Sequence, residues 1–311
     1  MMDVKKALAA TSFDMDAAFA ELRKRGLAAA SKKAGRAAAE GLVGVKVSDC
    51  GTRAALVEIN SETDFVSRND QFQRLVVAAA AAVVEAPVDT CPPPAPGSAS
   101  EVPLPTLEAV AMPEGGTLGE AVAATAATVR ENVKLRRAYV MAVTGAGEVI
   151  GQYLHGGVAP GLGRQAALVH VTGVGGTRED KSDAALAAAN KVAMHAVAAM
   201  PRFLNPESIP AEIVDAEMDI LRAQTENTGK PANIVEKIVK GRMGKFHEET
   251  CLLNQKFVMD DGVTVGKWVA GEAGGGLKVA AFVRVKVGEG IEVEEKDFAA
   301  EVAATVAESS T

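Results

Sequence analysis

Apolar residues near the start of the chain recur with the spacing of an amphipathic helix. Between Asp14 and Gly26 they fall at i, i+3, i+4 and i+7, which predicts a helix capped by Asp14. Residues 2–9 have the pattern of the end of another helix. Because one and a half helices cannot bury two apolar stripes, residues 1–26 are predicted to form an incomplete helical module.

The apolar pattern then changes to that of β-strands. LVGVKVS (42–48) and RAALVEIN (53–60) flank a turn of sequence DCG, which predicts a β-hairpin. Asn69 is the predicted N-cap of the helix that follows. The apolar residues of that helix share one face: Phe72, Leu75, Val76 and Ala79.

Composition changes after this helix. Residues 86–116 are rich in Pro, Ala, Ser and Gly, which predicts a flexible connection without a functional site. The connection ends at Thr117, where TLGE has the pattern of a capping box and predicts a new helix start.

Part of the pattern occurs twice. The tetrapeptide AALV stands at 54–57 and again at 166–169, and the same offset moves the helix near Phe72 into residues 182–200. A strand-rich region at 134–173 precedes that second helix. Hairpin, loop and amphipathic helix thus follow one another twice, which predicts two related α/β subdomains.

The second half of the chain also contains a charged helical insertion. Residues 207–249 are rich in Glu, Lys and Arg around a GKP turn, so a protruding antiparallel helical hairpin is predicted. A strand at 279–287 and a helix at 295–309 follow it. The predicted apolar positions of the hairpin are Ile213, Ala216, Ile220 and Ala223, then Val235, Val239 and Phe246.

These elements predict an α+β fold in four parts. A partial N-terminal helical module (1–26) leads into core subdomain N (27–140). Core subdomain C (141–290) carries the hairpin, and a C-terminal helical module (291–311) ends the chain.

Charge and hydropathy argue against two classes of partner. The net charge of −7 and the pI near 5.3 are unlike the basic footprint of a nucleic-acid-binding protein, and KLRRAY (134–139) is interpreted as a solvated strand face. The longest apolar run, LVVAAAAAVV (75–84), is too short for a transmembrane helix. We therefore expect no direct nucleic-acid partner and no membrane partner.

The residue types that carry chemistry form no catalytic or metal-binding motif. Cys50, Cys91 and Cys251 are odd in number and far apart, which fits a reducing compartment without a disulfide framework. GEAGGGLK (271–278) lacks the Gly-Lys-Ser/Thr of a phosphate-binding loop. His195 is predicted to be a hydrogen-bonded core residue rather than a ligand. The sequence predicts no enzyme, no metal and no cofactor.

One stretch, VEINSETDFVSR (57–68), is unusual for the end of a core strand. It runs from an apolar strand into acidic residues and then presents Phe65 between Asp64 and Arg68. The residues alone leave two interpretations open. Either Phe65 packs as a staple against the helix that begins at Asn69, or it lies at an exposed tip where a partner protein contacts it.

This stretch resembles the signature of the elongation factor Ts family, written here EINSETDFVSR (58–68). Residues 62–72 and 153–164 look most like mitochondrial members from plants and algae. Other blocks similar to family motifs follow in order along nearly the whole chain: MMDVKKAL (1–8), KKAGRAAAEGL (32–42), ENVKLRRA (131–138), Tyr153–Gly156, VAMHAVA (192–198), GKPANIVEKIVKGRM (229–243) and VGEGIE (287–292).

The resemblance implies a guanine nucleotide exchange factor for the GTPase elongation factor Tu. In the family, the segment matching Thr63, Asp64, Phe65 and Val66 intrudes near the magnesium site of the GTPase. It promotes GDP release by disturbing the magnesium and phosphate-loop contacts. Phe65 is implied to be the wedge, and Asp64 the polar group that fixes its approach. The alternative is an interaction scaffold for a translational GTPase that lacks exchange activity.

Further contacts with the partner are implied by the same resemblance. The first module resembles a ubiquitin-associated-like domain without its first helix, and Met2, Asp3 and Arg25 are its implied contacts with the GTPase domain. His155 is implied to face the third domain of elongation factor Tu. The C-terminal helix is implied to return to the GTPase domain through two residues: Phe298 and Val302.

The assembly and the compartment are also implied by resemblance alone. The expected partner is elongation factor Tu in its GDP-bound and nucleotide-free forms. The helical hairpin is expected to join two such pairs into a dimer of heterodimers. The mitochondrial matrix is the expected location, with the bacterial cytoplasm or a plastid as alternatives.

Overall fold

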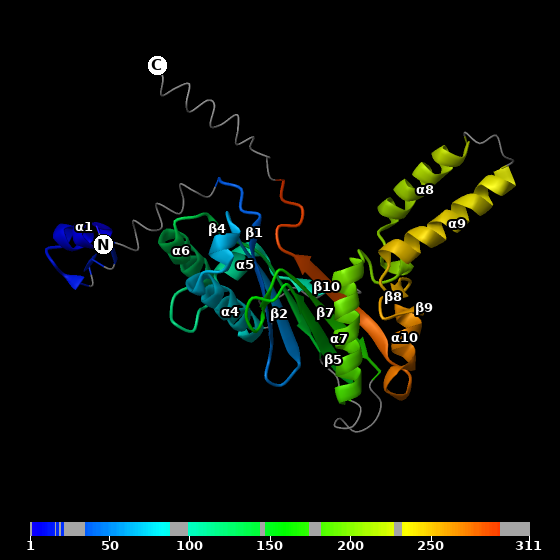
Figure 1. Ribbon diagram of the computed structural model, residues 1–311, viewed down its shortest axis with the longest axis horizontal. Helices are drawn as coiled ribbons and strands as arrows, with labels where there is room; N and C mark the ends of the chain where they lie inside the picture. Colours follow the sequence, from blue (N-terminus) through cyan, green and yellow to red (C-terminus); the bar gives the residue numbers. More distant parts are fainter. Residues whose placement is uncertain are drawn as a thin grey trace, which may run out of the picture.

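Two antiparallel β-sheets stacked face to face form the centre of the computed structural model (Figure 1). The structure describes residues 2–15, 17–18, 20–21, 35–87, 99–143, 147–173, 182–226 and 232–292. The first sheet has the order β3-β4-β2-β1-β6, and the second has the order β10-β7-β5. The strands of the first sheet are β1 (Glu40–Val47), β2 (Arg53–Ser61), β3 (Ser100–Glu101), β4 (Val133–Ala142) and β6 (Leu162–Gly163). The strands of the second are β5 (Glu148–His155), β7 (Gln165–Thr172) and β10 (Lys278–Lys286), and β8 (Lys256–Phe257) pairs with β9 (Asp260–Thr264) separately.

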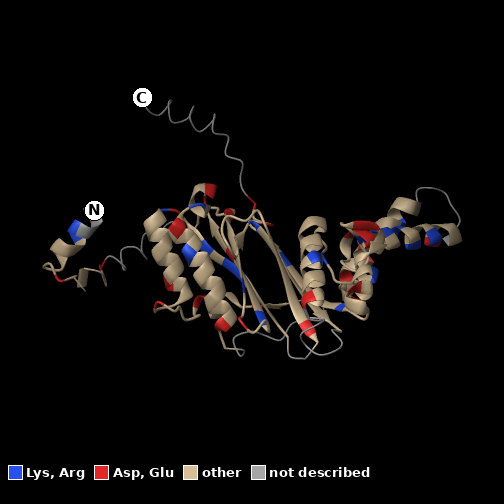
Figure 2. Cartoon of the chain, turned by 60° about the horizontal axis from the view of Figure 1, so that its bottom comes forward, with Lys and Arg blue, Asp and Glu red and all other residues tan. Residues whose placement is uncertain are grey.

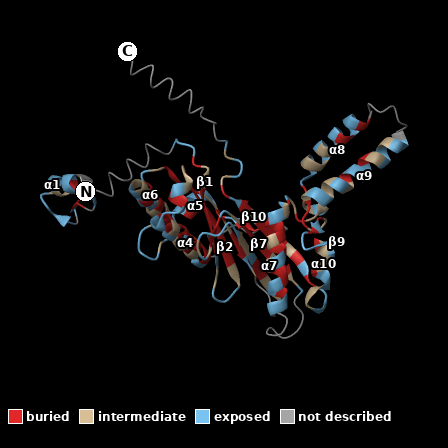
Figure 3. Cartoon of the chain, viewed as in Figure 1, coloured by how far each residue is buried: buried red, intermediate tan, exposed pale blue. Residues whose placement is uncertain are grey.

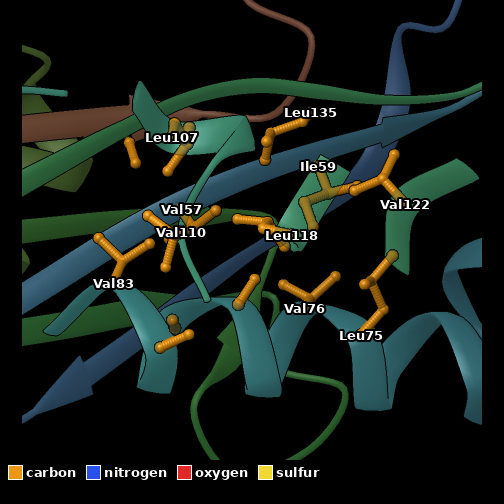
Figure 4. Packing of buried hydrophobic residues seen from close by; sticks show 14 of the residues in the cluster. Val57, Ile59, Leu75, Val76, Val83, Leu107, Val110, Leu118, Val122 and Leu135 are labelled. Atoms are coloured by element: carbon orange, nitrogen blue, oxygen red, sulfur yellow. The ribbon is translucent and has the colours of Figure 1, made fainter. Parts of the chain in front are cut away.

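Helices cover the outer face of each sheet. On the first sheet, side chains of β2 meet residues of the covering helices, as Val57 and Ile59 do near Val76 and Leu118 (Figure 4). The predicted α+β class is confirmed, and the layers run helix, sheet, sheet, helix. The covering helices are α4 (Asp70–Glu85), α5 (Leu104–Glu108) and α6 (Leu118–Val129) on the first sheet, and α7 (Ser182–Ala199) and α10 (Val265–Gly271) on the second.

The predicted hairpin and the helix after it are confirmed. β1 pairs with β2 across a turn in which Gly51 has a φ of +70°, a value that favours glycine. The Asn69 side chain caps α4 by accepting hydrogen bonds from the backbone N–H groups of Gln71 and Phe72. All four residues of the predicted apolar face are buried: Phe72, Leu75, Val76 and Ala79.

The two AALV segments alternate in the same way. In β2, Ala55 and Val57 face the helices while Ala54 and Leu56 face the second sheet. In β7 the corresponding residues alternate likewise, with Ala167 and Val169 toward α7 and Ala166 and Leu168 toward the first sheet. Both strands are therefore buried on both faces, which explains why they read as apolar runs.

A glycine lies opposite the last residue of each AALV segment. Gly44 pairs with Val57, and Gly151 pairs with Val169. A Cβ at Gly44 would lie 2.8 Å from a backbone oxygen of α4, and one at Gly151 would lie 2.3 Å from backbone of α7. Each helix therefore sits directly on its sheet, where only glycine fits.

The predicted flexible connection at 86–116 is wrong for the part that the structure describes. β3 and α5 form within it, and Val102, Leu107 and Val110 belong to the core beneath α4 and α6. Proline at the start of α5 is compatible with the first turn of a helix, so the Pro-rich composition does not prevent order here. Residues 88–98 lie outside the described residues, and the predicted capping box at Thr117 is confirmed.

The predicted helical hairpin consists of α8 (Ala211–Glu226) and α9 (Ala232–Thr250), which pack against each other. Figure 3 colours much of the hairpin as exposed or intermediate, and Figure 2 shows charged residues along it. The predicted seam in the first helix is wrong, because Ile220 is 51% exposed and Ala216 and Ala223 are exposed. The observed seam is Val214, Met218 and Leu221 from α8 with Val235, Val239, Met243 and Phe246 from α9.

The N-terminal module is described only in part. α1 (Met2–Ala10) is helical, and the Asp14 carboxylate accepts a hydrogen bond from the Ala17 backbone N–H at 2.8 Å, as expected of the predicted cap. Phe19 and Leu22, which the sequence places on the same helix, lie outside the described residues. Within the described ranges, none of the helices combines the length and hydropathy needed to cross a bilayer.

His195 joins α7 to the β8–β9 turn, and the prediction of a hydrogen-bonded core histidine is confirmed. Its side chain is fully buried; Nδ1 accepts a hydrogen bond from the Val258 N–H at 3.2 Å, and Nε2 lies 3.0 Å from Gln255 Oε1. The ring must therefore be neutral, with its proton on Nε2. Burial lowers the pKa of His195, because the charged form loses its hydration.

We expect the protein to lose stability in mild acid through His195. The unfolded chain takes up a proton near the ordinary pKa of 6.5, whereas the folded chain resists protonation, so stability is present above that pH and falls below it. Urea denaturation at pH 7.5 and pH 5.5 should show a smaller loss for His195→Gln than for the natural sequence. The His195→Gln variant will still lose some stability between pH 7.5 and pH 5.5, since burial also lowers the pKa of His170. Equal losses in both proteins would contradict this assignment.

Candidate partner-binding site

The strand that leads to the conspicuous VEINSETDFVSR stretch contains a buried carboxylate. Glu58 of β2 lies on the face toward the second sheet and has no exposed surface. Its Oε1 accepts hydrogen bonds from Arg136 at 2.8 Å, from the Gly288 N–H at 2.8 Å and from Asn60 at 3.1 Å, and its Oε2 accepts from Arg137 at 2.7 Å. These donors from β2, from β4 and from the turn after β10 satisfy a charge that would otherwise be costly to bury.

A β-bulge lets both arginines reach the same carboxylate. In the β2–β4 ladder Glu58 pairs with Arg137 and the next residue pairs with Leu135, which leaves Arg136 as the extra residue. Leu135 and Ala138 both face the helices, so the bulge resets the alternation between them. The interpretation of KLRRAY as a solvated face is therefore wrong for the arginines, whose side chains are about one-fifth exposed.

Beyond Ser61 the chain makes a sharp exposed turn that we call the tip, residues 62–66. α3 (Asp64–Ser67) is a single helical turn that begins within the tip and ends one residue after it. Phe65 is 77% exposed, whereas the adjacent Val66 is 6% exposed and belongs to the core under α4. The staple interpretation of Phe65 is therefore wrong, and Val66 faces the core rather than the outside.

The base of the tip is held by the residues that precede β4. The Glu131 carboxylate accepts two hydrogen bonds from Thr63, one from the backbone N–H at 3.0 Å and one from the hydroxyl at 2.7 Å. The backbone N–H of Asn132 donates to the Glu62 carboxylate. On the other side, the Ser67 hydroxyl donates to the Gly41 carbonyl of β1 at 3.2 Å. Phe65 thus stands between two anchored segments.

Asp64 is the polar residue beside the exposed ring. Its carboxylate forms an ion pair with Arg68 at 3.2 Å, one helical turn away. Both side chains are substantially exposed, so the pair is weak and the carboxylate can exchange it for another donor at little cost.

Among the expected contact residues that the structure describes, one group lies together. Thr63, Asp64, Phe65 and Val66 are consecutive at the tip, whereas His155 is exposed at the end of β5 in the other sheet. Residues 2 and 3 lie in α1, and nothing is described of their side chains. The remaining expected contacts lie outside the described residues: Arg25, Phe298 and Val302.

Little else in the described residues suggests chemistry. In that part of the chain, no three side chains of the His, Cys, Asp or Glu type gather as a metal site would require. Cys50 is exposed in the β1–β2 turn, Cys251 is buried, and both are free thiols.

Sequence reasoning missed the residues that hold the tip and its strand. Glu58 is a charged residue in an otherwise apolar strand, and the adjacent arginines of β4 could have been matched to it by charge. Glu131 is the first residue of ENVKLRRA (131–138), a block similar to a family motif, but its contact with Thr63 spans 68 positions and could not be predicted without the fold.

Comparison with known proteins finds a match to the family described as Elongation factor TS over residues 62–289. The protein named "Elongation factor Ts, mitochondrial" from Ostreococcus tauri is 49% identical over 98% of this chain and 88% of its own length. "Elongation factor Ts" from Paramagnetospirillum magneticum is 42% identical over 98% and 91%, and the protein of that name from Rhizobium etli is 43% identical over 98% and 93%. The matched segment begins at the tip.

We expect Glu58→Gln to destabilise the fold strongly. The amide cannot accept from all four donors, and two arginines would keep their charge without a counterion, so the free energy of unfolding should fall by about 3 kcal/mol. Urea denaturation measures this loss. Glu85→Gln, at an exposed position of α4, is the matched control and should change stability by less than about 0.5 kcal/mol.

Substitutions at two neighbouring residues should test whether Phe65 is exposed and Val66 is buried. Phe65→Ala should leave the free energy of unfolding within about 0.5 kcal/mol of its original value, because the ring contacts mainly water. Val66→Ala should lower it by about 1.5 kcal/mol, since buried methyl groups are removed. The reverse order in thermal or urea denaturation would mean that Phe65 is a core residue.

Proposed function

This chain belongs to the elongation factor Ts family, and we propose that it is a guanine nucleotide exchange factor that acts on elongation factor Tu. The observation that carries the proposal is Phe65, a large apolar side chain that is 77% exposed on a turn anchored from both sides. An exposed aromatic ring on a rigid support is the usual form of a hot spot in a protein interface.

The proposed mechanism uses binding rather than bond chemistry. Thr63, Asp64, Phe65 and Val66 form the segment that approaches the magnesium site of elongation factor Tu. Phe65 enters between helices of the GTPase, and Asp64 exchanges Arg68 for a donor on the partner. Val66 contributes from beneath, because its burial turns Phe65 outward. Magnesium and phosphate-loop contacts of the bound GDP are weakened as a result.

Thermodynamic linkage then determines the direction of the cycle. If the exchange factor weakens GDP binding by some factor, GDP weakens binding of the exchange factor by the same factor. The complex is therefore most stable when the nucleotide site is empty. GTP binding displaces the exchange factor in turn, so no energy source is needed within this chain.

The remaining contacts in our proposal lie around this central wedge. The N-terminal module, with Met2, Asp3 and Arg25, docks on the GTPase domain of elongation factor Tu, and the C-terminal segment returns to it through Phe298 and Val302. His155 faces the third domain. The similarity to family members over 98% of the chain supports this arrangement.

The finer architecture and the assembly are part of the same proposal. Residues 27–140 and 141–290 are two related subdomains, which the shared alternation of the AALV segments and the glycine opposite each of them support. The hairpin formed by α8 and α9 joins two complexes into a dimer of heterodimers. The mitochondrial matrix is the proposed location, supported by the name of the relative from Ostreococcus tauri.

Nucleotide release is the direct test. Elongation factor Tu is loaded with a fluorescent GDP analogue and chased with unlabelled GDP, with and without this protein. The natural sequence should accelerate release steeply. Phe65→Ala should weaken the effect tens- to hundreds-fold, since truncating an aromatic anchor costs about 2–4 kcal/mol. Met259→Ala, which removes a 57% exposed side chain from the β8–β9 turn, is the control and should retain full activity.

The assay distinguishes an exchange factor from a scaffold, and it tests the role of Phe65 separately. A natural protein that binds elongation factor Tu without accelerating release would be a scaffold, and the exchange function would be rejected. Equal acceleration by the natural protein and by Phe65→Ala would keep the exchange function and reject Phe65 as its wedge.

A further inference from the structure

We infer that Glu131 is a positioning residue of the exchange site: it fixes the tip in the shape that presents Phe65 before the partner arrives. The inference rests on the proposed function and adds a residue that lies outside the tip itself. Glu131 contacts Thr63, two residues before Phe65, and the contact joins segments 68 positions apart.

The contact between Glu131 and Thr63 has two parallel hydrogen bonds. Oε2 accepts the Thr63 backbone N–H at 3.0 Å, and Oε1 accepts the Thr63 hydroxyl at 2.7 Å. A charged acceptor strengthens both bonds, and two bonds fix an orientation that one would leave free to rotate. The backbone of Thr63 is therefore held in direction as well as in place.

Glu131 itself projects from a firm support. α6 ends at Val129, and Arg130 adopts a left-handed conformation with a φ of +61° that turns the chain sharply into β4. Leu118 and Val122 of α6 and Val133 of β4 are buried in the core on either side of that turn. The backbone that carries the Glu131 side chain is therefore fixed by the core of the first sheet.

The hydrogen bonds of Thr63 indicate that its contact with Glu131 does more than start α3. Thr63 occupies the N-cap position of α3, where a threonine hydroxyl usually accepts a hydrogen bond from the helix backbone. Here its side chain makes no capping hydrogen bond and donates to Glu131 instead. Through this bond the hydroxyl anchors α3, which carries Phe65, to the segment that precedes β4, and the local cap is lost.

A second contact prevents the tip from pivoting about Thr63. The Asn132 backbone N–H donates to the Glu62 carboxylate, and Glu62 also pairs with Arg36 at 3.4 Å. Successive residues at the base of the tip are thus bound by successive residues before β4. Removing the Glu131 carboxylate would release the backbone N–H and the hydroxyl of Thr63 at the start of α3, while the Ser61 hydroxyl would still donate to the Thr63 carbonyl at 2.9 Å and Glu62 would stay attached.

Preorganisation predicts the size of the effect. Each backbone residue that becomes free must be ordered again on binding, which weakens the productive complex by about tenfold per residue. Glu131→Ala should therefore reduce acceleration of GDP release by about ten- to a hundred-fold. Glu131→Gln should retain most of it, because its Oε1 can accept the Thr63 N–H while its Nε2 donates to the hydroxyl oxygen. Glu114→Ala, an exposed acid in the turn before α6, is the control for lost charge and should be fully active.

A double-substitution cycle with Phe65→Ala distinguishes positioning from general damage. If Glu131 acts through Phe65, Glu131→Ala will have little further effect in the Phe65→Ala background. The inference would be overturned if the two substitutions reduced the acceleration of GDP release by the product of their separate factors. It would also be overturned if Glu131→Gln reduced it as much as Glu131→Ala. Either result would indicate that Glu131 makes a separate contact with the partner.

Amide hydrogen exchange in the isolated chain supplies a readout that needs no GTPase. Glu131→Ala should accelerate exchange in a peptide that covers residues 61–68 and leave α7 unchanged. Unchanged exchange in that peptide would overturn the inference even if activity falls, and faster exchange in α7 as well would mean that the fold is damaged. If the natural protein does not accelerate GDP release at all, the proposed function fails first and the inference fails with it.

Discussion

The buried carboxylate of Glu58 is the interaction on which the arrangement of the two sheets depends. A charge without exposed surface is tolerated only when its hydrogen bonds are satisfied, and here the donors come from β2, from β4 and from Gly288 after β10. Gly288 has a φ of +73°, and a Cβ there would lie 2.1 Å from the Ala39 carbonyl oxygen. The chain can therefore reach Glu58 at this point only because the residue is glycine.

The strand fixed by Glu58 is also the strand that carries the tip. With its central part held between the covering helices and the second sheet, β2 places Ser61 at a defined position, and Glu131 and Ser67 hold the turn on both sides. Val66 lies inside and Phe65 outside because adjacent residues of one helical turn point in different directions. A large exposed aromatic side chain adds little to the stability of the folded state, so its placement on so firm a base supports the binding role that we propose for it.

Features that depend on neighbours along the chain could be predicted from the sequence, and features that depend on distant partners could not. The β1–β2 hairpin, the cap at Asn69 and the buried His195 follow from local patterns. The bulge at Arg136 cannot be read locally, since it exists only when β4 pairs with β2. The predicted seam of the helical hairpin was wrong for a related reason. α8 has apolar residues on two faces, and the face that is buried is the one that packs against α9. Ile220 thus remained exposed.

The EINSETDFVSR signature (58–68) cannot form the tip by itself, because residues that hold the tip and its strand lie elsewhere in the chain. EINSETDFVSR contains the proposed wedge and the buried acid, but Glu131, Arg136 and Arg137 come from a segment about seventy positions further along the chain. An isolated peptide with this sequence would lack every hydrogen-bond donor to Glu58 except Asn60, and it would lack the acceptor that holds Thr63. The exposed ring would then have to be ordered by the partner, at the cost of affinity. The proposed binding element is therefore the tip together with β2 and β4, and the short motif identifies it without being sufficient to form it.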